Sequence, residues 1–287
     1  MRPISSIFPA KPINMGGIVL DQALPIGRLQ QVSPFLLIHH WNQTLPGGNM
    51  QNELGVGPHP HRGFSPVTFI FKGELQHRDS RMNNSIVKAG GTQWMHAGLG
   101  IMHSERPTKE LAEQGGEFEL IQFWVNDPAK NKMTQPRYYP LSKEETPVIR
   151  SNDGKTKAYV VAGNFMNTKG PIEPLTPLLT VRFEFEEGAE YEFEVPETFN
   201  TLLYQLDGEL LLNQSQPSRA KDLTLFTSQP GTITVHAKKQ TRAILLAGEP
   251  IDEPVVTYGP IVMNTQTEIM EALRDAQIGK MGILIED

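Results

Sequence analysis

The sequence contains no cysteine. This absence excludes disulfide bonds, zinc sites built from thiolates and a cysteine nucleophile. Any metal site in this chain must therefore use histidine, carboxylate, amide or water ligands. Because disulfides are permitted but not required outside the cytosol, the lack of cysteine does not by itself identify a compartment.

Long apolar segments and basic clusters are also absent. The chain has no run of about 18 apolar residues, the length that a membrane-spanning helix needs, and its first residues lack the apolar core of a signal peptide. Acidic residues outnumber basic ones by 32 to 26, which gives a net charge of −6, and no basic stripe is present. We therefore expect a soluble, cytoplasmic protein with no membrane partner and no direct contact with nucleic acid.

Glycine and proline, by contrast, are frequent: 25 and 23 of the 287 residues, spread along the whole chain. Between them lie short segments rich in β-branched and aromatic residues, such as "FLLIHHW" and "PVTFIFKGEL". This pattern predicts an all-β protein with many short strands, arranged as a sandwich or a barrel. The run "VRFEFEEGAEYEFEV", residues 181–195, alternates with period two and predicts a hairpin around Glu-Glu-Gly.

The two halves of the chain resemble each other. "FIFKGELQHRDS" at residues 69–80 and "YQLDGELLLNQS" at residues 204–215 share one pattern of apolar residues before Gly-Glu-Leu. This suggests two copies of one β-barrel. A polar, proline-containing segment separates them, so we predict an N-terminal domain over residues 1–135 and a C-terminal domain over residues 136–287.

One amphipathic helix is predicted near the C-terminus. Thr265 is a suitable N-cap, Glu268 stands three residues later as in a capping box, and Gly279 follows the last apolar position. A shorter segment, residues 107–116, is compatible with a single helical turn. The predicted fold is therefore all-β with a C-terminal helix.

Two short segments carry pairs of metal-type side chains: "HPH" at residues 59–61 and "HSE" at residues 103–105. Residues i and i+2 of a strand point to the same face, and Pro60 favours an extended backbone. If the two segments are neighbouring strands, His59, His61, His103 and Glu105 converge, and a divalent ion offsets the cost of burying them. A single His-x-His pair is most often structural, but five of the eight histidines lie between residues 59 and 103.

The segment "HPHRGFSPVTFIFKGELQHRDS" followed by "QWMHAGLGIMHSE" resembles the signature of the pirin family, within the cupin superfamily. The resemblance implies a bicupin, with two cupin-type β-barrels and a metal in the N-terminal barrel only. It implies the metal ligands His59, His61, His103 and Glu105. The usual metal of the family is iron, so Fe(II) is expected, although such nitrogen and oxygen ligands also suit Ni, Cu, Mn or Zn.

Several residues depart from the family pattern, and one further histidine, His77, lies near the predicted ligands in the sequence. Ser65 replaces a glutamate of the common motif, His96 replaces a threonine, and His39 and His40 stand where an acidic residue is common. We expect these side chains to support the site or to lie on the surface, and we expect His77 to line the site and not to bind the metal.

Arg62 and Asp79 are candidates for a buried pair or for orienting a ligand imidazole, because metal-bound histidines usually need a hydrogen-bond acceptor. If the metal served an oxygenase reaction, the protein would need an apolar cavity of several hundred Å³ next to it for the substrate. Candidates for its lining are Phe35, Met95, His96 and Met102.

Some pirins are similar to quercetin 2,3-dioxygenases, which open the central ring of a flavonol and release carbon monoxide. The resemblance therefore implies an oxygenase that takes a small aromatic, flavonol-like substrate and O₂, with Glu105 as both metal ligand and general base. The alternative that it implies is a non-enzymatic, iron-based redox sensor. Such a regulator would bind a protein partner, such as a transcription factor or a metabolic enzyme.

Overall fold

The computed structural model describes residues 1–286, which form two compact units. The unit that we call the histidine-bearing unit contains Asn14–Leu20, Phe35–Lys143 and residues 251–286. The second unit contains Met1–Ile13, Asp21–Pro34 and Glu144–Pro250. The predicted domains, 1–135 and 136–287, are uninterrupted segments and differ from these units, because the start of the chain belongs with the second unit and its end with the histidine-bearing unit.

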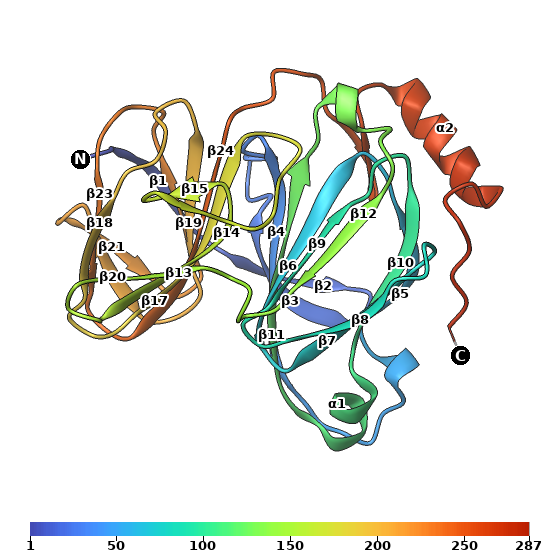
Figure 1. Ribbon diagram of the computed structural model, residues 1–287, viewed down its shortest axis with the longest axis horizontal. Helices are drawn as coiled ribbons and strands as arrows, with labels where there is room; N and C mark the ends of the chain where they lie inside the picture. The colour runs from blue at the N-terminus through green and yellow to red at the C-terminus, as the bar shows by residue number, and fades with distance from the viewer. Residues whose placement is uncertain (287) are drawn as a thin grey trace. The chain divides into compact units, whose positions relative to one another are not determined.

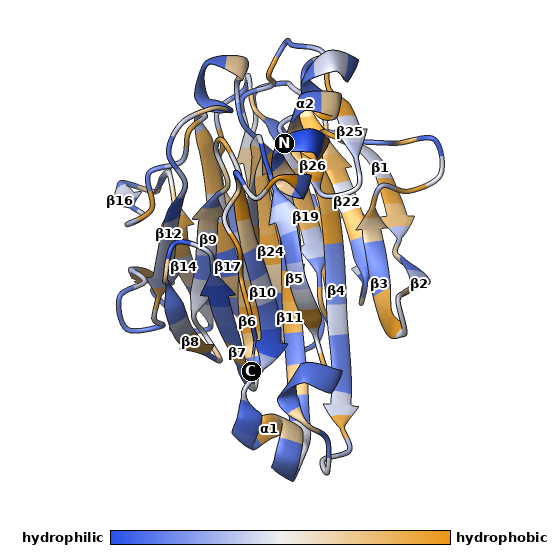
Figure 2. Cartoon of the chain, turned by 90° about the vertical axis from the view of Figure 1, so that its right-hand side faces the viewer, coloured by the Kyte–Doolittle hydropathy of each residue, from blue (hydrophilic) through white to orange (hydrophobic). Residues whose placement is uncertain are grey.

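Two antiparallel sheets form the body of the histidine-bearing unit (Figure 1). The larger sheet has the order β12 (Arg137–Leu141), β9 (Thr92–His96), β6 (Phe64–Lys72), β11 (Gly116–Asn126), β4 (Phe35–Leu45), β3 (Ile18–Leu24) and β2 (Lys11–Met15). The smaller sheet has the order β5 (Val56–His61), β10 (Ile101–Pro107), β7 (Glu74–Asp79) and β8 (Asn84–Lys88). Hydrophobic and hydrophilic residues are interleaved along these strands (Figure 2), as expected when one face of a sheet is buried.

Short elements complete this unit: η1 (Gln51–Glu53), α1 (Lys109–Gln114), η2 (Ala129–Asn131), the pair β25 (Val256–Tyr258) and β26 (Ile261–Met263), and α2 (Gln266–Gln277). The predicted C-terminal helix is confirmed, since Thr265 caps α2 and forms a capping box with Glu268. Helix α2 buries Ile269 and Ala272 in an apolar cluster with Ile261 and Met281. None of the helices within residues 1–286 has the length and apolar character needed to cross a membrane.

The second unit also consists of two main antiparallel sheets. One has the order β1 (Ile4–Pro9), β22 (Asp222–Phe226), β19 (Asn200–Gln205), β24 (Thr241–Gly248), β17 (Leu178–Phe185), β14 (Thr156–Ala162) and β13 (Val148–Arg150). The other has the order β18 (Glu190–Phe193), β23 (Ile233–Ala237), β20 (Glu209–Leu212) and β21 (Gln216–Arg219), and β15 (Asn164–Phe165) pairs with β16 (Thr168–Lys169). Phe183, Phe193, Leu210 and Leu245 belong to its buried apolar core.

The predicted hairpin around Glu-Glu-Gly is wrong. Strand β17, which precedes this turn, pairs with β14 along one edge and with β24 along the other. Strand β18, which follows it, pairs with β23 of the other sheet. Both edges of β17 are therefore taken, and the turn joins two sheets. Period-two alternation shows that each strand has one buried face, but it does not reveal the partner of that strand.

Candidate metal centre

Strands β5 and β10, which carry the two predicted pairs, are antiparallel neighbours. His103 of β10 stands opposite His59 of β5, and Ile101 stands opposite His61. On its other side β10 pairs with β7, where Asp79 stands opposite His103. The expectation that the two histidine-containing segments are adjacent strands is therefore confirmed.

Three imidazole nitrogens converge between these strands. Nε2 of His59 lies 3.0 Å from Nε2 of His61 and 3.0 Å from Nε2 of His103. Two nitrogens that bind one metal ion at about 2.1 Å and at a right angle lie about 3 Å apart. The separations of the three predicted histidines thus suit one ion, and together they form a cluster that can hold a metal.

Backbone carbonyls fix the tautomers of His59 and His61. Nδ1 of His59 lies 2.8 Å from the oxygen of Gly57, and Nδ1 of His61 lies 3.1 Å from the oxygen of Pro260. Because a carbonyl oxygen can only accept, each Nδ1 carries the hydrogen and each Nε2 presents a lone pair. Lone pairs that face each other across 3.0 Å repel unless a cation lies between them.

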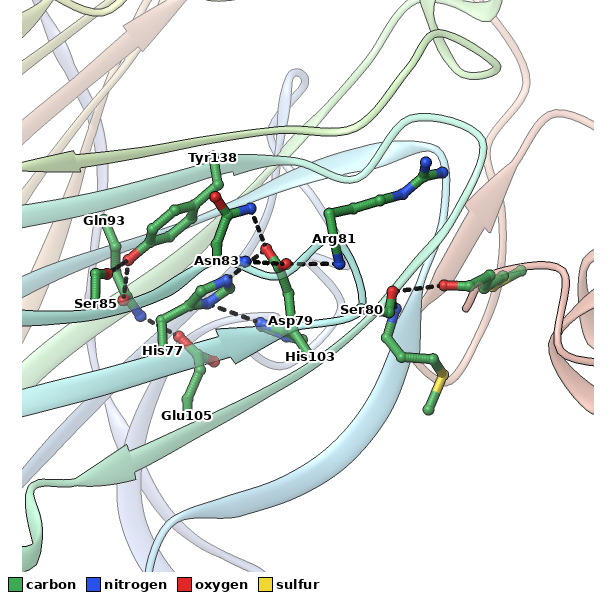
Figure 3. Close-up of polar contacts among 12 residues, drawn as sticks. His77, Asp79, Ser80, Arg81, Asn83, Ser85, Gln93, His103, Glu105 and Tyr138 are labelled. Carbon is green, nitrogen blue, oxygen red and sulfur yellow. Dashed lines mark hydrogen bonds and ion pairs between the residues drawn. The ribbon is translucent and has the colours of Figure 1, made fainter. Parts of the chain in front are cut away.

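His103 has a side-chain partner instead, His77, as Figure 3 shows. Nε2 of His77 lies 3.0 Å from Oδ2 of Asp79, and Nδ1 of His77 lies 3.4 Å from Nδ1 of His103. His77 therefore donates through Nε2 to the carboxylate and accepts through Nδ1 from His103. This assignment leaves Nε2 of His103 as the third lone pair in the cluster, and it gives His77 the supporting place that we expected for it.

Further contacts hold Asp79 and His77 in place. Asp79 accepts hydrogen bonds from the backbone N–H groups of Arg81 and Asn83 and from the Asn83 side chain. Burial acts to raise the pKa of Asp79, but the hydrogen bonds from His77 and Asn83 outweigh it and hold the pKa below its ordinary value. The ring of Tyr138 stacks on His77 at a centroid separation of 3.9 Å. Asp79 is thus an ionised carboxylate held in place by hydrogen bonds, and the His77 ring beside it is held by Asp79 and Tyr138.

Two members of the histidine cluster, His61 and His103, are held in the neutral form. Burial lowers the pKa of His61 and of His103 well below the ordinary value, and the neighbouring His59 lowers it further. A neutral imidazole with its second nitrogen hydrogen-bonded is the form that binds metal ions. The donor set therefore fits a divalent cation, with three oriented lone pairs from His59, His61 and His103.

Glu105 projects into the same cavity as His59 and His61, but its carboxylate has other partners. Oε1 accepts from Nε2 of Gln93 at 2.5 Å and from the Thr68 hydroxyl at 3.2 Å, and Oε2 accepts from Nε2 of Gln122 at 2.7 Å. Among residues 1–286, the cluster of close ligand atoms comprises the three histidines without Glu105. Its place as the fourth ligand stays a prediction.

The amides around Glu105 were not predicted. Gln93 lies in the "QWMHAG" segment, of which Met95 and His96 were the predicted site residues, and its side-chain oxygen also accepts from the Tyr138 hydroxyl. Gln122 lies in an ordinary alternating strand, β11, and nothing in its local sequence marks it. Both positions become recognisable only when the strands are assembled.

A cavity of about 410 Å³ adjoins the cluster. Five of its lining side chains end in a polar group: His39, His59, His61, Glu105 and Gln122. The rest of the lining is mostly apolar: Met15, Ile18, Leu20, Leu37, Trp41, Val56, Leu75, Leu120, Trp124, Gly259 and Pro260. Burial lowers the pKa of His39 to about 4, so this side chain is a neutral wall residue at physiological pH.

The predicted lining residues Phe35, Met95, His96 and Met102 do not line this cavity, so that prediction is wrong. Met102 alternates with His103 along β10 and packs instead against the apolar cluster below α2. Met95 lies in another small buried cluster with Ala97 and Ile101. A residue directly next to a predicted ligand in a strand, such as Met102 next to His103, points to the opposite face of that strand.

The positions that depart from the family pattern have structural partners. Ser65 and His96 are in contact, since the Ser65 hydroxyl lies 2.8 Å from Nδ1 of His96 and also donates to Asp127. Burial raises the pKa of Asp127 to about 7. These two unusual residues therefore complement each other. His40 is fully buried and lies 3.1 Å from Glu119.

The predicted pair between Arg62 and Asp79 is wrong. Arg62 follows His61 and donates to the oxygen of Leu99 and to Asp275 of helix α2, at 2.6 and 3.0 Å. Asp79 instead accepts a hydrogen bond from His77, which in turn contacts His103 of the histidine cluster. Gly98 also has a structural role, as a Cβ at this position, where φ is +50°, would collide with the carbonyl oxygen of Thr134.

Comparison with known proteins supports the resemblance seen in the sequence. The Pirin family model matches residues 17–125, and the model of the Pirin C-terminal cupin domain matches residues 180–282. The chain is 34% identical to a pirin-like protein of Solanum lycopersicum, with 95% of this chain and 90% of the relative covered. It is 33% identical to pirin of Homo sapiens, with 90% and 86% covered.

The crystal structure of a quercetin 2,3-dioxygenase from Acinetobacter baumannii superposes with a TM-score of 0.93. It is 33% identical in sequence and covers 99% of this chain and 100% of its own. These similarities confirm the predicted fold, which is all-β with two cupin-type domains and a C-terminal helix. The chain belongs to the pirin family.

Proposed function

We propose that this chain is a metal-dependent oxygenase of the quercetin 2,3-dioxygenase type, with Fe(II) as its metal. One observation carries the proposal: a mostly apolar cavity of about 410 Å³ is lined by His59 and His61, two members of the histidine cluster. Such a cavity has the size and character of a small-molecule site. The similarity to the Acinetobacter baumannii quercetin 2,3-dioxygenase supports a flavonol-like substrate and O₂.

His59, His61, His103 and Glu105 would hold the ion. A divalent ion held there supplies Lewis acidity toward a substrate oxygen and coordination positions for substrate and O₂. The protein contributes preorganisation, since each imidazole already has its second nitrogen hydrogen-bonded. No ligand ring therefore needs to change its tautomer when the ion binds.

Glu105 would act as the general base. Its carboxylate would accept the proton of the substrate hydroxyl, which is acidic in a flavonol. Gln93 and Gln122 hold the two carboxylate oxygens from either side and so fix the direction in which the free lone pairs point. Trp124 and Leu120 would pack against a flat aromatic ring and exclude water from it.

The proposal is tested by anaerobic reconstitution with Fe(II), followed by addition of quercetin and O₂, with loss of flavonol absorbance as the measurement. We expect consumption by the wild type and none by His61→Ala or Glu105→Ala. His236→Ala, in the second unit, is the matched control and should behave as the wild type. Iron-loaded wild-type protein that leaves quercetin unchanged would overturn the oxygenase proposal and favour a redox-sensing protein that binds a partner.

A further inference from the structure

A second cavity, of about 450 Å³, lies against β10. Ser104 and Arg106 line it, and these residues alternate along the strand with His103 and Glu105. Because side chains alternate across a strand, this cavity and the histidine cluster are on opposite faces of β10. We call it the Arg106 pocket; its other charged lining residues are Arg78, Lys109, Glu113 and Glu286.

The Arg106 pocket holds a carboxylate of this chain, that of Glu286. Nε of Arg106 lies 3.0 and 2.9 Å from the two carboxylate oxygens, and Nη2 lies 2.6 Å from Oε2. Burial acts to raise the pKa of Glu286, but hydrogen bonds from Arg106 and Ser104 outweigh it and keep the carboxylate ionised. This forked contact is the geometry in which arginine recognises carboxylates.

The guanidinium of Arg106 is positioned independently of Glu286. Its Nη1 donates to the backbone oxygens of Asn52 and Leu54, at 2.9 and 2.6 Å. Two backbone carbonyls therefore orient the fork, whether or not a carboxylate occupies it. A group that is already oriented loses less entropy when it binds a ligand.

The charge of the pocket exceeds what Glu286 neutralises. Arg78, Arg106 and Lys109 are cationic, while Glu113 and Glu286 are the carboxylates. When Glu286 leaves, three cations face one carboxylate, and Lys109 lies 3.8 Å from that carboxylate, Glu113. A dianion would therefore match the vacated pocket better than a single carboxylate does.

The tail that carries Glu286 is a short tether. Met281 is fully buried, and its carbonyl oxygen accepts from the Ser80 hydroxyl and the Met102 N–H. Beyond it the chain runs along the outside of the sheet toward the C-terminus (Figure 1), and Ile283 and Ile285 are 75% and 82% exposed. Apolar packing of these two side chains thus contributes little, and the contact of Glu286 is open to competition.

We propose that the Arg106 pocket is a binding site for small dicarboxylates, in which Glu286 acts as a tethered competitor. One carboxylate of the ligand takes the place of Glu286 on Arg106, and the other reaches the cations Arg78 and Lys109. The proposal rests on this pocket alone and is independent of the oxygenase function.

The test is calorimetric titration of the metal-free chain of 287 residues with glutarate at constant ionic strength. A tether this short gives Glu286 an effective concentration in the millimolar range, so its removal in Glu286→Gln should tighten glutarate binding about tenfold. Glu187→Gln, an exposed carboxylate of the second unit, is the matched control and should bind as the wild type does. Butyrate, with one carboxylate, should bind about tenfold more weakly than glutarate.

Arg106→Gln in the Glu286→Gln background should abolish binding. Because Arg106 also holds two backbone carbonyls, Arg106→Lys is the second variant; it keeps the charge but loses the fork, and it should also weaken binding. Equal glutarate affinity in the wild type and Glu286→Gln, or binding that survives both Arg106 variants, would overturn the proposal. Inorganic phosphate that binds as tightly as glutarate would also overturn it, because the site would then recognise charge alone.

Discussion

Nδ1 of His77 lies 3.4 Å from Nδ1 of His103, while Nε2 of His77 lies 3.0 Å from the carboxylate of Asp79. A buried carboxylate is thereby connected through one imidazole to another imidazole whose free nitrogen belongs to the histidine cluster (Figure 3). His77 thus sets the tautomer of His103 without being part of the cluster itself.

His77→Phe should lower the affinity for Fe(II) by about 10–100-fold, because Nδ1 of His103 loses its acceptor and the ring loses its fixed tautomer. Phenylalanine keeps a ring that can stack on Tyr138. Anaerobic competition with a chromogenic chelator measures the affinity, and His236→Phe is the control with the same chemical change. Equal affinities in the wild type and His77→Phe would show that His77 does not orient His103.

Glu105→Gln should abolish quercetin consumption while leaving the fold intact. The glutamine carbonyl can still accept from the amide of Gln93 or Gln122, but the side chain has no anionic oxygen for a metal and cannot serve as the base. Steady-state turnover and the thermal midpoint are the two measurements. Glu117→Gln, on the exposed side of the same unit, controls for loss of one negative charge. Turnover by Glu105→Gln at the wild-type rate would contradict the proposed role.

Asp79→Asn should destabilise the metal-free protein by about 2 kcal/mol at neutral pH, because hydrogen bonds to a buried charge are lost. The folded protein holds the pKa of Asp79 below its ordinary value, so the unfolded chain binds the proton first as the pH falls. The stabilisation by Asp79 is therefore fully present above about pH 5 and disappears as the pH falls through the folded-state pKa. Urea unfolding of both proteins across this range measures it; a difference independent of pH would contradict the account.

Gly98→Ala should destabilise the protein by about 3 kcal/mol or more, because the new Cβ combines a positive φ with a collision at the Thr134 carbonyl. Gly16→Ala is the matched control, since φ there is +60° but no atom lies within 4 Å of the added Cβ. It should cost only the backbone strain, about 1–2 kcal/mol. Equal losses in urea unfolding of the two variants would show that the contact with Thr134 does not matter.

The parts of the site that could be predicted from sequence are those that depend on local geometry. The i, i+2 spacing placed His59 with His61 on one face of a strand, and the capping box at Thr265 marked the start of α2. Both patterns are set by backbone periodicity within a few residues.

Contacts between distant segments could not be predicted in this way. Arg62 pairs with Asp275, which lies more than 200 positions away, and the oxygen that accepts from His61 belongs to Pro260. The partner of β17 likewise depends on which strands lie at its two edges. Alternation specifies the buried face of a strand, but register and neighbours follow from the assembled sheet.

Anomalous diffraction at the iron edge, from crystals of protein reconstituted anaerobically with Fe(II), tests the central claim most directly. The account predicts one peak among the Nε2 atoms of His59, His61 and His103, with a carboxylate oxygen of Glu105 as the fourth ligand. Iron bound at other residues would contradict the proposed centre. Glu105 still held by Gln93 and Gln122, away from the bound iron, would contradict its role as a ligand.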